Sequence, residues 1–178
     1  MHRNILLDLL RKHICFDKNE TNMLAETIKF VKANEDCFKR ELEIGHITGS
    51  AWIIDNSHQF VLLTHHRKLD KWFQPGGHCD GDADVLNVAM KEAIEETGLA
   101  DIKVLSFDIF DVDIHEIPAR KDIAAHFHYD IRFLFEADKN IPLVISEESN
   151  DLAWVEIFKV STLNDSESIT RMCRKVQN

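Results

Sequence analysis

The stretch from Gly77 to Leu99 reads GHCDGDADVLNVAMKEAIEETGL, and it decides how the rest of the chain is interpreted. Its second half has apolar residues at helical spacing, with Glu92, Glu95 and Glu96 at positions i, i+3 and i+4. This spacing places the three carboxylates on one helix face within a single turn. A solvated acidic face is one interpretation. The adjoining glycines favour another, a divalent-cation site, because glycine lets the backbone approach an ion or phosphate closely.

The same stretch resembles the signature of the Nudix hydrolases, G-x5-E-x7-R-E-U-x-E-E-x-G-U, where U is an aliphatic residue. The residues at the expected offsets are Gly77, Glu92, Ala93, Glu95, Glu96, Gly98 and Leu99. Two positions depart from the signature: Ala83 replaces its first glutamate, and Lys91 replaces its arginine. Lys91 keeps the positive charge but lacks the bidentate fork of arginine. Asp82 and Asp84 flank Ala83 and are the candidates to supply the missing carboxylate.

The resemblance extends from about residue 45 to residue 154, to a group of bacterial Nudix proteins whose substrate is poorly defined. It is carried by residues 45–52 (GHITGSAW), 62–66 (LLTHH), 72–78 (WFQPGGH) and 126–130 (HFHYD). It implies an α/β (α+β) fold, a Nudix-like α/β/α sandwich around a mixed β-sheet. Residues 45–178 would form this domain. Residues 1–44 would form an N-terminal helical extension packed on it.

The resemblance also implies a reaction and a cofactor. The reaction is hydrolysis of a diphosphate (pyrophosphate) bond in a nucleoside diphosphate linked to another moiety, by a water activated by Mg²⁺ or Mn²⁺. The Gly77 carbonyl, Glu92 and Glu96 would bind the metal, and Glu95 would be a further ligand or would orient the water. The proton acceptor would come from the signature helix, at Glu95 or Glu96, or from a loop near the end of the domain.

The loop candidates for the proton acceptor are Glu147 and Glu148, for which a solvated loop is the alternative interpretation. The candidates for substrate contact are Arg67, Lys68, Trp72, Gly76, His78, His126 and His128. The period of a strand sends His126, His128 and Asp130 to one face of the sheet. Arg67 and Lys68 would neutralise phosphate, and Trp72 would stack on a base.

The flanking sequence predicts helices before the signature and strands on both sides of it. Apolar stripes predict a helix around residues 5–10 and another after Asp17, which with Glu20 resembles a capping box. Strands are expected at 47–54, 60–64, 102–110, 125–135 and 152–157. Residues 73–77 are expected to be irregular, and the signature helix to begin at Asp82 or Asp84 and end before Gly98. A polar, weakly amphipathic helix is expected at 166–175.

Composition excludes several classes of protein. The formal net charge of −10 disfavours binding to a nucleic-acid duplex. No apolar run approaches the roughly 20 residues of a membrane helix, and the first residues lack the features of a secretory signal. The four cysteines contain no C-x-x-C pair and are interpreted as reduced thiols of a cytoplasmic protein.

Two other functions remain open at the level of sequence. Ala83 and Lys91 motivate a Nudix-fold module that binds a nucleotide or a protein without turnover, and the N-terminal helices would be its interaction surface. A hydrolase that uses a soft metal bound by His78, Cys79 and nearby histidines is a third hypothesis. Homodimerisation is also an expectation, because it is common among the proteins that the chain resembles.

Overall fold

The computed structural model describes residues 2–119, 124–147 and 149–177. In chain order its elements are α1 (Asn4–Lys12), α2 (Lys18–Ala33), β1 (Gly45–Asp55), β2 (Phe60–His66), β3 (Lys71–Phe73), β4 (Gly76–His78), α3 (Val85–Thr97), β5 (Lys103–Val104), β6 (Asp111–Ile117), β7 (His126–Ala137), β8 (Ser149–Glu156), the 3-10 helix η1 (Ile157–Thr162) and α4 (Glu167–Gln177). In the described part of the chain, no helix has the length and apolar character needed to cross a membrane.

The strands form one mixed sheet around β1, which is buried along its whole length. Strand β1 runs parallel to β7 over eleven residue pairs, from Gly45 opposite Phe127 to Asp55 opposite Ala137. On its other side β1 pairs antiparallel with β4 and then with β2, while β3 and β8 flank β2. Strands β5 and β6 pair antiparallel with β7. The mixed sheet expected from the sequence is therefore confirmed.

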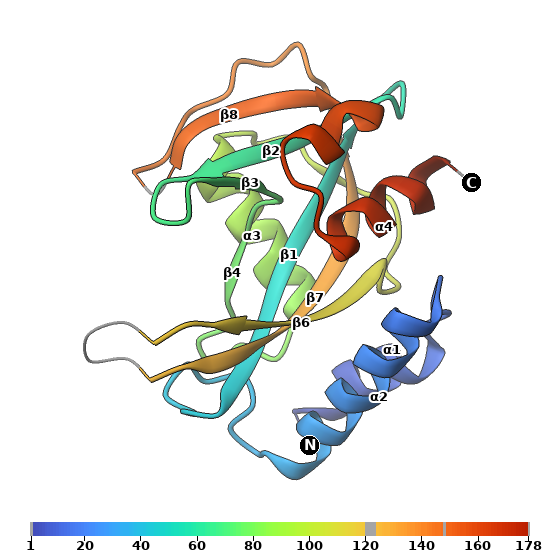
Figure 1. The fold of residues 1–178 in the computed structure, drawn as a ribbon, viewed down its shortest axis with the longest axis vertical. Helices are drawn as coiled ribbons and strands as arrows, with labels where there is room; N and C mark the ends of the chain where they lie inside the picture. The colour runs from blue at the N-terminus through green and yellow to red at the C-terminus, as the bar shows by residue number, and fades with distance from the viewer. Residues whose placement is uncertain (1, 120–123, 148, 178) are drawn as a thin grey trace.

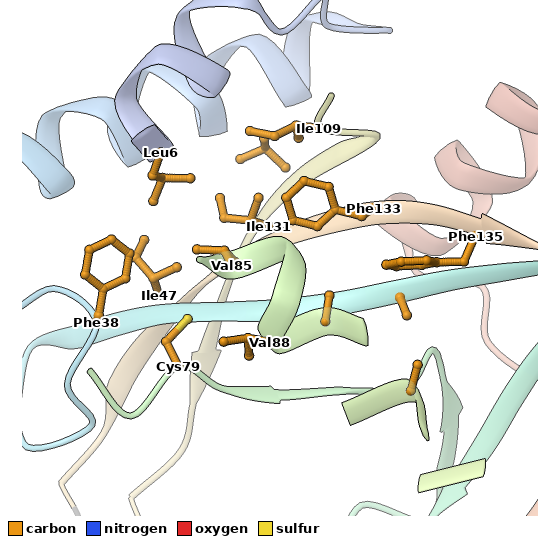
Figure 2. Close-up of a cluster of buried hydrophobic side chains, with 14 of the residues drawn as sticks. Leu6, Phe38, Ile47, Cys79, Val85, Val88, Ile109, Ile131, Phe133 and Phe135 are labelled. Atoms are coloured by element: carbon orange, nitrogen blue, oxygen red, sulfur yellow. The ribbon is translucent and has the colours of Figure 1, made fainter. Parts of the chain in front are cut away.

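Helices cover both faces of the sheet (Figure 1). Ile47, Ala51 and Ile53 of β1 belong to a hydrophobic core shared with α1, α2 and α3. Figure 2 shows this core, in which Val85 of α3 lies beside Ile131 of β7 and Leu6 of α1 lies above them. Trp52 and Ile54 alternate with these residues and pack against η1 and α4. One strand thus supplies both cores.

The N-terminal helices pack on the domain, as expected. Asp17 caps α2 by accepting a hydrogen bond from the Glu20 N–H at 2.8 Å, which confirms the predicted cap. Phe30 of α2 stacks on Tyr129 of β7, with ring centroids 3.9 Å apart. Ile5 was expected in the apolar stripe of α1, but its side chain is 64% exposed. A boundary between an extension and a domain at residue 44 stays a prediction.

Three sequence-based expectations are corrected by the structure. The strand expected at 102–110 is limited to Lys103–Val104, because Ser106 accepts a hydrogen bond from the Asp108 N–H and forms a turn. Strand β6 follows instead, from Asp111, and was missed because Asp111 and Asp113 look like surface residues in the sequence. Of residues 73–77, expected to be irregular, Phe73 ends β3 and Gly76 and Gly77 begin β4, because β2 and β1 provide their hydrogen-bonding partners.

The C-terminal helix is also more deeply buried than its polar sequence predicted. Ile169, Arg171, Met172 and Cys173 of α4 are all buried. A sequence scale counts Arg171 as polar, yet its side chain is fully buried because two carboxylates face it. The structure therefore replaces the predicted weakly amphipathic helix with one whose charged residue is part of the core.

A buried ionic network connects α4 to strands β6 and β7. The Arg132 guanidinium donates to Asp130 at 2.7 Å, to Asp111 at 3.2 Å and to Asp113 at 3.0 Å. Arg171 of α4 donates to both oxygens of Asp111, at 2.7 and 2.9 Å. These five side chains are nearly inaccessible to solvent. Every charge in the network therefore depends on its partners for solvation.

Glu20 extends the network to the N-terminal helices. Lys175 of α4 donates to Glu20 at 2.5 Å and lies 2.9 Å from Asp111. His13 and the Phe16 N–H also contact the Glu20 carboxylate, at 2.7 and 2.6 Å. Burial by itself would raise the pKa of Glu20, but these hydrogen bonds lower it to about 2. Glu20 is therefore charged while fully buried.

We predict that replacing Arg171 with methionine strongly destabilises the fold, since Asp111 would lose a partner inside the core. The expected loss of unfolding free energy is about 3–5 kcal/mol, measured by chemical denaturation. Arg11→Met is the matched control, because Arg11 pairs with Asp8 on the exposed face of α1. An exposed pair contributes about 1 kcal/mol or less. Equal effects of the two substitutions would contradict the assigned role of Arg171.

The lowered pKa of Glu20 predicts loss of stability in acid. Because the folded pKa lies below the ordinary value of 4.5, the stabilisation is fully present above about pH 4.5 and is lost as the pH falls towards 2. Its size is on the order of 3 kcal/mol. We expect Glu20→Gln to flatten the curve of unfolding free energy against pH in this window. Glu26→Gln, on the exposed side of the same helix, should leave the curve unchanged.

Candidate active site

Helix α3 lies directly against the strand pair formed by β1 and β4. Gly49 of β1 pairs with Gly77 of β4, and Ser50 pairs with Gly76. A Cβ atom on Gly49 would lie 2.8 Å from the carbonyl oxygen of Val85, in the first turn of α3. Glycine at position 49 is therefore what allows the helix to approach the sheet so closely.

The two ends of α3 are those that the sequence predicted. Asp84 caps the first turn by accepting a hydrogen bond from the Asn87 N–H at 3.1 Å. Gly98 ends the helix in the left-handed conformation, with φ of 72°. The orientation of the helix about its axis is then set by Val85, Val88, Ala89 and Ala93, which are buried in the core. The glutamates on the next face are turned towards β4.

Glu92 and Glu96 converge on the two glycines of β4. The Gly76 N–H donates a hydrogen bond to Glu96 Oε1 at 2.8 Å. The Glu92 carboxylate fills the space beside Gly77, where a Cβ atom would lie 2.5–2.7 Å from its carbon and oxygens. Both glutamate side chains are half-buried. The fold therefore gathers two carboxylates and a glycine backbone at one point.

Residues 46–172 match the family model of the NUDIX domain. The chain belongs to the Nudix hydrolase family. Nudix hydrolases belong to the pyrophosphohydrolase class. The match to the family model covers the sheet, the signature helix and the start of α4. No curated protein was found to match the chain.

Solved structures show the same fold at low sequence identity. A C. elegans Ap4A hydrolase in a binary complex is 17% identical, with a TM-score of 0.60, and the match covers 74% of this chain and 94% of that one. The E. coli dihydroneopterin triphosphate pyrophosphohydrolase is 14% identical, with a TM-score of 0.57 and coverage of 74% and 95%. A Nudix hydrolase from M. smegmatis is 18% identical, with a TM-score of 0.55 and coverage of 75% and 84%.

Glu95 is placed differently from the other signature glutamates of this Nudix domain. Its side chain is exposed and forms an ion pair with Lys91, with a 3.7 Å distance between Nζ and Oε1. Lys91 replaces the signature arginine, and it pairs with Glu95 on the solvent side of the helix. A role for Glu95 in metal binding or in catalysis stays a prediction.

The position of the missing signature glutamate lies at the edge of the hydrophobic core. Ala83 is half-buried and packs against the cluster shared by α1, α2 and α3. Asp82 and Asp84 on either side are exposed. Asp82 accepts a hydrogen bond from the Asp84 N–H at 2.9 Å, and Asp84 caps α3. Both flanking carboxylates thus have a local structural role at the start of the helix.

Three predicted substrate contacts, Arg67, Lys68 and Trp72, lie on the β2–β3 hairpin. Arg67 and Lys68 are exposed in its turn, where Arg67 donates to the carbonyl of Ser149 at 3.2 Å. Trp72 stacks on His65 across the hairpin, with ring centroids 5.0 Å apart. The candidate base Glu147 is exposed on the loop before β8. Glu148 lies outside the described residues.

The remaining predicted contacts, His78, His126 and His128, are brought together by the sheet. The rings of His78 and His128 lie 5.0 Å apart, and those of His126 and His128 lie 5.2 Å apart. His46 and His115 join the same group, although the sequence did not indicate them. His46 is the second residue of β1. Only the parallel pairing of β1 with β7 places it beside His128.

Cys79, considered above as a soft-metal ligand, belongs to the hydrophobic core. Its side chain is 4% exposed and lies near Phe38 and Ile47 (Figure 2). Burial raises the pKa of the thiol far above its ordinary value. A thiolate is the form that binds metal. The structure therefore does not favour Cys79 as a ligand.

We predict that Gly77→Ala weakens metal binding, because the new methyl group would displace the Glu92 carboxylate. The expected loss of Mn²⁺ affinity is at least about 10-fold, as for other changes that shift a ligand, and it is measurable by calorimetry. Gly81→Ala is the control, since a Cβ atom there meets nothing within 4 Å. Its left-handed backbone would cost some stability, but not metal affinity. Unchanged affinity in Gly77→Ala would contradict the proposed geometry.

Proposed function

We propose that this Nudix domain hydrolyses a diphosphate bond in a nucleoside diphosphate linked to another moiety. The observation that carries the proposal is the convergence of Glu92 and Glu96 on Gly76 and Gly77. Phosphoryl transfer requires a positioned nucleophile and neutralisation of negative charge, and little covalent chemistry by the protein. A pair of carboxylates beside a glycine backbone can hold a cation, and a bound cation would neutralise the negative charge of the substrate.

The residues at this point fit a hard divalent cation. Carboxylate and carbonyl oxygens are the donors that Mg²⁺ and Mn²⁺ prefer. Gly77 leaves open the space that a side chain would fill, so its backbone and Glu92 are in close contact. We propose that Glu92, Glu96 and the Gly77 carbonyl hold the ion, with Glu95 as a further ligand. When bound, Mg²⁺ or Mn²⁺ polarises phosphoryl oxygen and lowers the pKa of the attacking water.

The chain itself orients these ligands before any ion binds. The Gly76 N–H holds one oxygen of Glu96, which fixes the rotamer of that side chain. Glu92 is confined between α3 and β4 by the close approach of the helix. A carboxylate of the signature helix, Glu95 or Glu96, would accept the proton of the attacking water, with Glu147 as the loop alternative. The exposure of Glu95 would let it exchange that proton with solvent.

Substrate binding needs local positive charge, because the chain carries a net charge of −10. Arg67 and Lys68 offer two exposed cations on the β2–β3 hairpin, and we propose that they contact substrate phosphate. The stacked rings of Trp72 and His65 offer a flat platform for a base. Gly76, next to Gly77, would contact the phosphates nearest the ion, whereas His78 faces the opposite side of the sheet. The four cysteines are free, which supports the proposal of a reducing, cytoplasmic location.

A non-catalytic binding module is the second candidate, and two observations favour it. Ala83 packs against the core at the position where the signature has a glutamate, and Lys91 is paired with exposed Glu95. Either change would lower catalysis without removing the cation site. The two candidates differ in one measurable respect, which is turnover.

We expect metal-dependent hydrolysis in a panel of nucleoside triphosphates, dinucleoside polyphosphates, nucleotide sugars and coenzyme A, assayed with Mg²⁺ and with Mn²⁺ by phosphatase-coupled phosphate release. Glu96→Gln should lower kcat by about 100-fold or more, because the negative charge that would hold the cation is lost. The names of the solved relatives justify the polyphosphates in the panel, as one is an Ap4A hydrolase and another acts on dihydroneopterin triphosphate.

Glu41→Gln is the matched control, since Glu41 is exposed on the segment before β1. It should leave kcat unchanged. Calorimetric Mn²⁺ binding with no turnover on any substrate would favour the binding module. Absence of Mn²⁺ binding in the wild type would refute the metal site and the hydrolase proposal together.

A further inference from the structure

Five imidazoles gather on the sheet face opposite α3. They come from four strands: His46 of β1, His78 of β4, His115 of β6, and His126 and His128 of β7. Neighbouring rings in the group have centroids 4.8–5.4 Å apart. His46 and His128 are opposite one another in the parallel β1–β7 pair, and His115 is opposite His128 in the β6–β7 pair. Strand pairing therefore builds the cluster from residues up to 82 positions apart.

Two of these histidines have buried nitrogens without a partner. Among the described residues, neither ring nitrogen of His46 makes a hydrogen bond of normal geometry, and the same holds for Nε2 of His128. His46 is 3% exposed. Leaving a buried polar atom unsatisfied costs about 1–3 kcal/mol. Three such atoms at one place indicate that the cluster is built to bind something that supplies the missing interactions.

The charge state of the cluster decides what that ligand can be. Burial, followed by the nearby imidazoles, lowers the pKa of His46 to about 4 and that of His128 to about 2. Both rings are therefore neutral near pH 7 and carry a lone pair. A neutral imidazole can bind a metal ion through its lone pair, whereas it offers a phosphate a single hydrogen-bond donor and no positive charge. With their buried nitrogens close to those of neighbouring histidines, these two rings suit a cation better than an anion.

A hydrogen bond outside the cluster orients His126 for the same purpose. Its Nδ1 lies 2.9 Å from the carbonyl oxygen of Ala124. A carbonyl can only accept, so Nδ1 carries a proton and Nε2 is the nitrogen left to coordinate an ion. This arrangement, with one nitrogen donating to a carbonyl and the other free to coordinate, is typical of metal-bound histidine.

We propose that His46, His126 and His128 bind a divalent transition-metal ion that prefers nitrogen ligands, of the Zn²⁺ class. One ligand atom of each residue lies within 4.8 Å of the others. Ligand nitrogens of a tetrahedral zinc site are roughly 3.4 Å apart, so small side-chain rotations close the site. His78, with its ring 5.0 Å from those of His46 and His128, lies next to it.

This site is separate from the carboxylate site in both place and chemistry. Gly77 faces Glu92 on the side of α3, whereas His78, the next residue of β4, faces the opposite side of the sheet. The first site offers oxygen ligands to a hard cation, and the second offers imidazole nitrogens to a softer one. The proposal does not rest on the hydrolase function. Its ion would join the beginning of β1 to the beginning of β7.

A second group of ligand-type residues, His13, Cys15 and Glu20, must be separated from this site in any test. The Glu20 carboxylate there already accepts hydrogen bonds from Lys175 and the Phe16 N–H. A positively charged lysine in contact with the carboxylate opposes a further cation. We therefore measure binding in a Cys15→Ser background, which removes the thiol.

The experiment titrates Zn²⁺ into the full chain by calorimetry, with excess Mg²⁺ present to occupy the carboxylate site. We expect one Zn²⁺ per chain in the Cys15→Ser protein. His126→Ala and His46→Phe should each weaken binding by at least about 10-fold, and phenylalanine keeps the packing of the buried ring. His58→Ala, an exposed histidine in the turn after β1, is the matched control and should bind as before.

Two further measurements keep the proposal open to refutation. Co²⁺ should give the visible absorption of a four-coordinate site in the Cys15→Ser protein. The same absorption should be missing in His126→Ala. The circular dichroism spectrum of metal-free His126→Ala shows whether that variant is folded. The double variant Glu92→Gln, Glu96→Gln should keep its Zn²⁺ affinity. Loss of Zn²⁺ in that variant, equal binding in the histidine variants, or no binding at all would each overturn the proposal.

Discussion

A chain of buried charges joins both ends of the sequence to the sheet. It starts at Glu20 in α2, passes through Lys175 of α4 to Asp111 of β6, and continues through Arg132 to Asp130 of β7. A buried ion pair adds little net stability compared with apolar residues of the same volume, but the loss of one member leaves an uncompensated charge. The helices at the two termini are therefore held to one arrangement on the sheet.

The same chain of contacts reaches the candidate active site. Asp130 accepts hydrogen bonds from Thr48 and Ser50 of β1, and from Gln74 just before β4. These residues lie beside or opposite the glycines on which Glu92 and Glu96 converge. The position of β4 relative to α3 therefore depends on a carboxylate that is itself held by Arg132. The buried ion pairs and the candidate active site are therefore linked by one set of hydrogen bonds.

The signature and its helix were readable from the sequence because their determinants are local. Helical spacing put the carboxylates of Glu92 and Glu96 within one turn of each other, and Asp84 and Gly98 marked the ends of α3. The same spacing could not distinguish Glu95 from its neighbours, since its exposure depends on how the helix packs. Strand β6 was missed because Asp111 and Asp113 look like surface residues until Arg132 and Arg171 are placed against them.

The sequence by itself determined the family, the mixed α/β class, the caps of the signature helix and the presence of clustered acidic ligands. Only the tertiary structure decided which glutamates meet the glycines, which charges are buried, and that His46 lies beside His128. The physical reason is distance along the chain. Capping hydrogen bonds and side-chain periodicity act over a few residues, whereas the histidine cluster and the ionic network depend on strand register between segments far apart in the sequence.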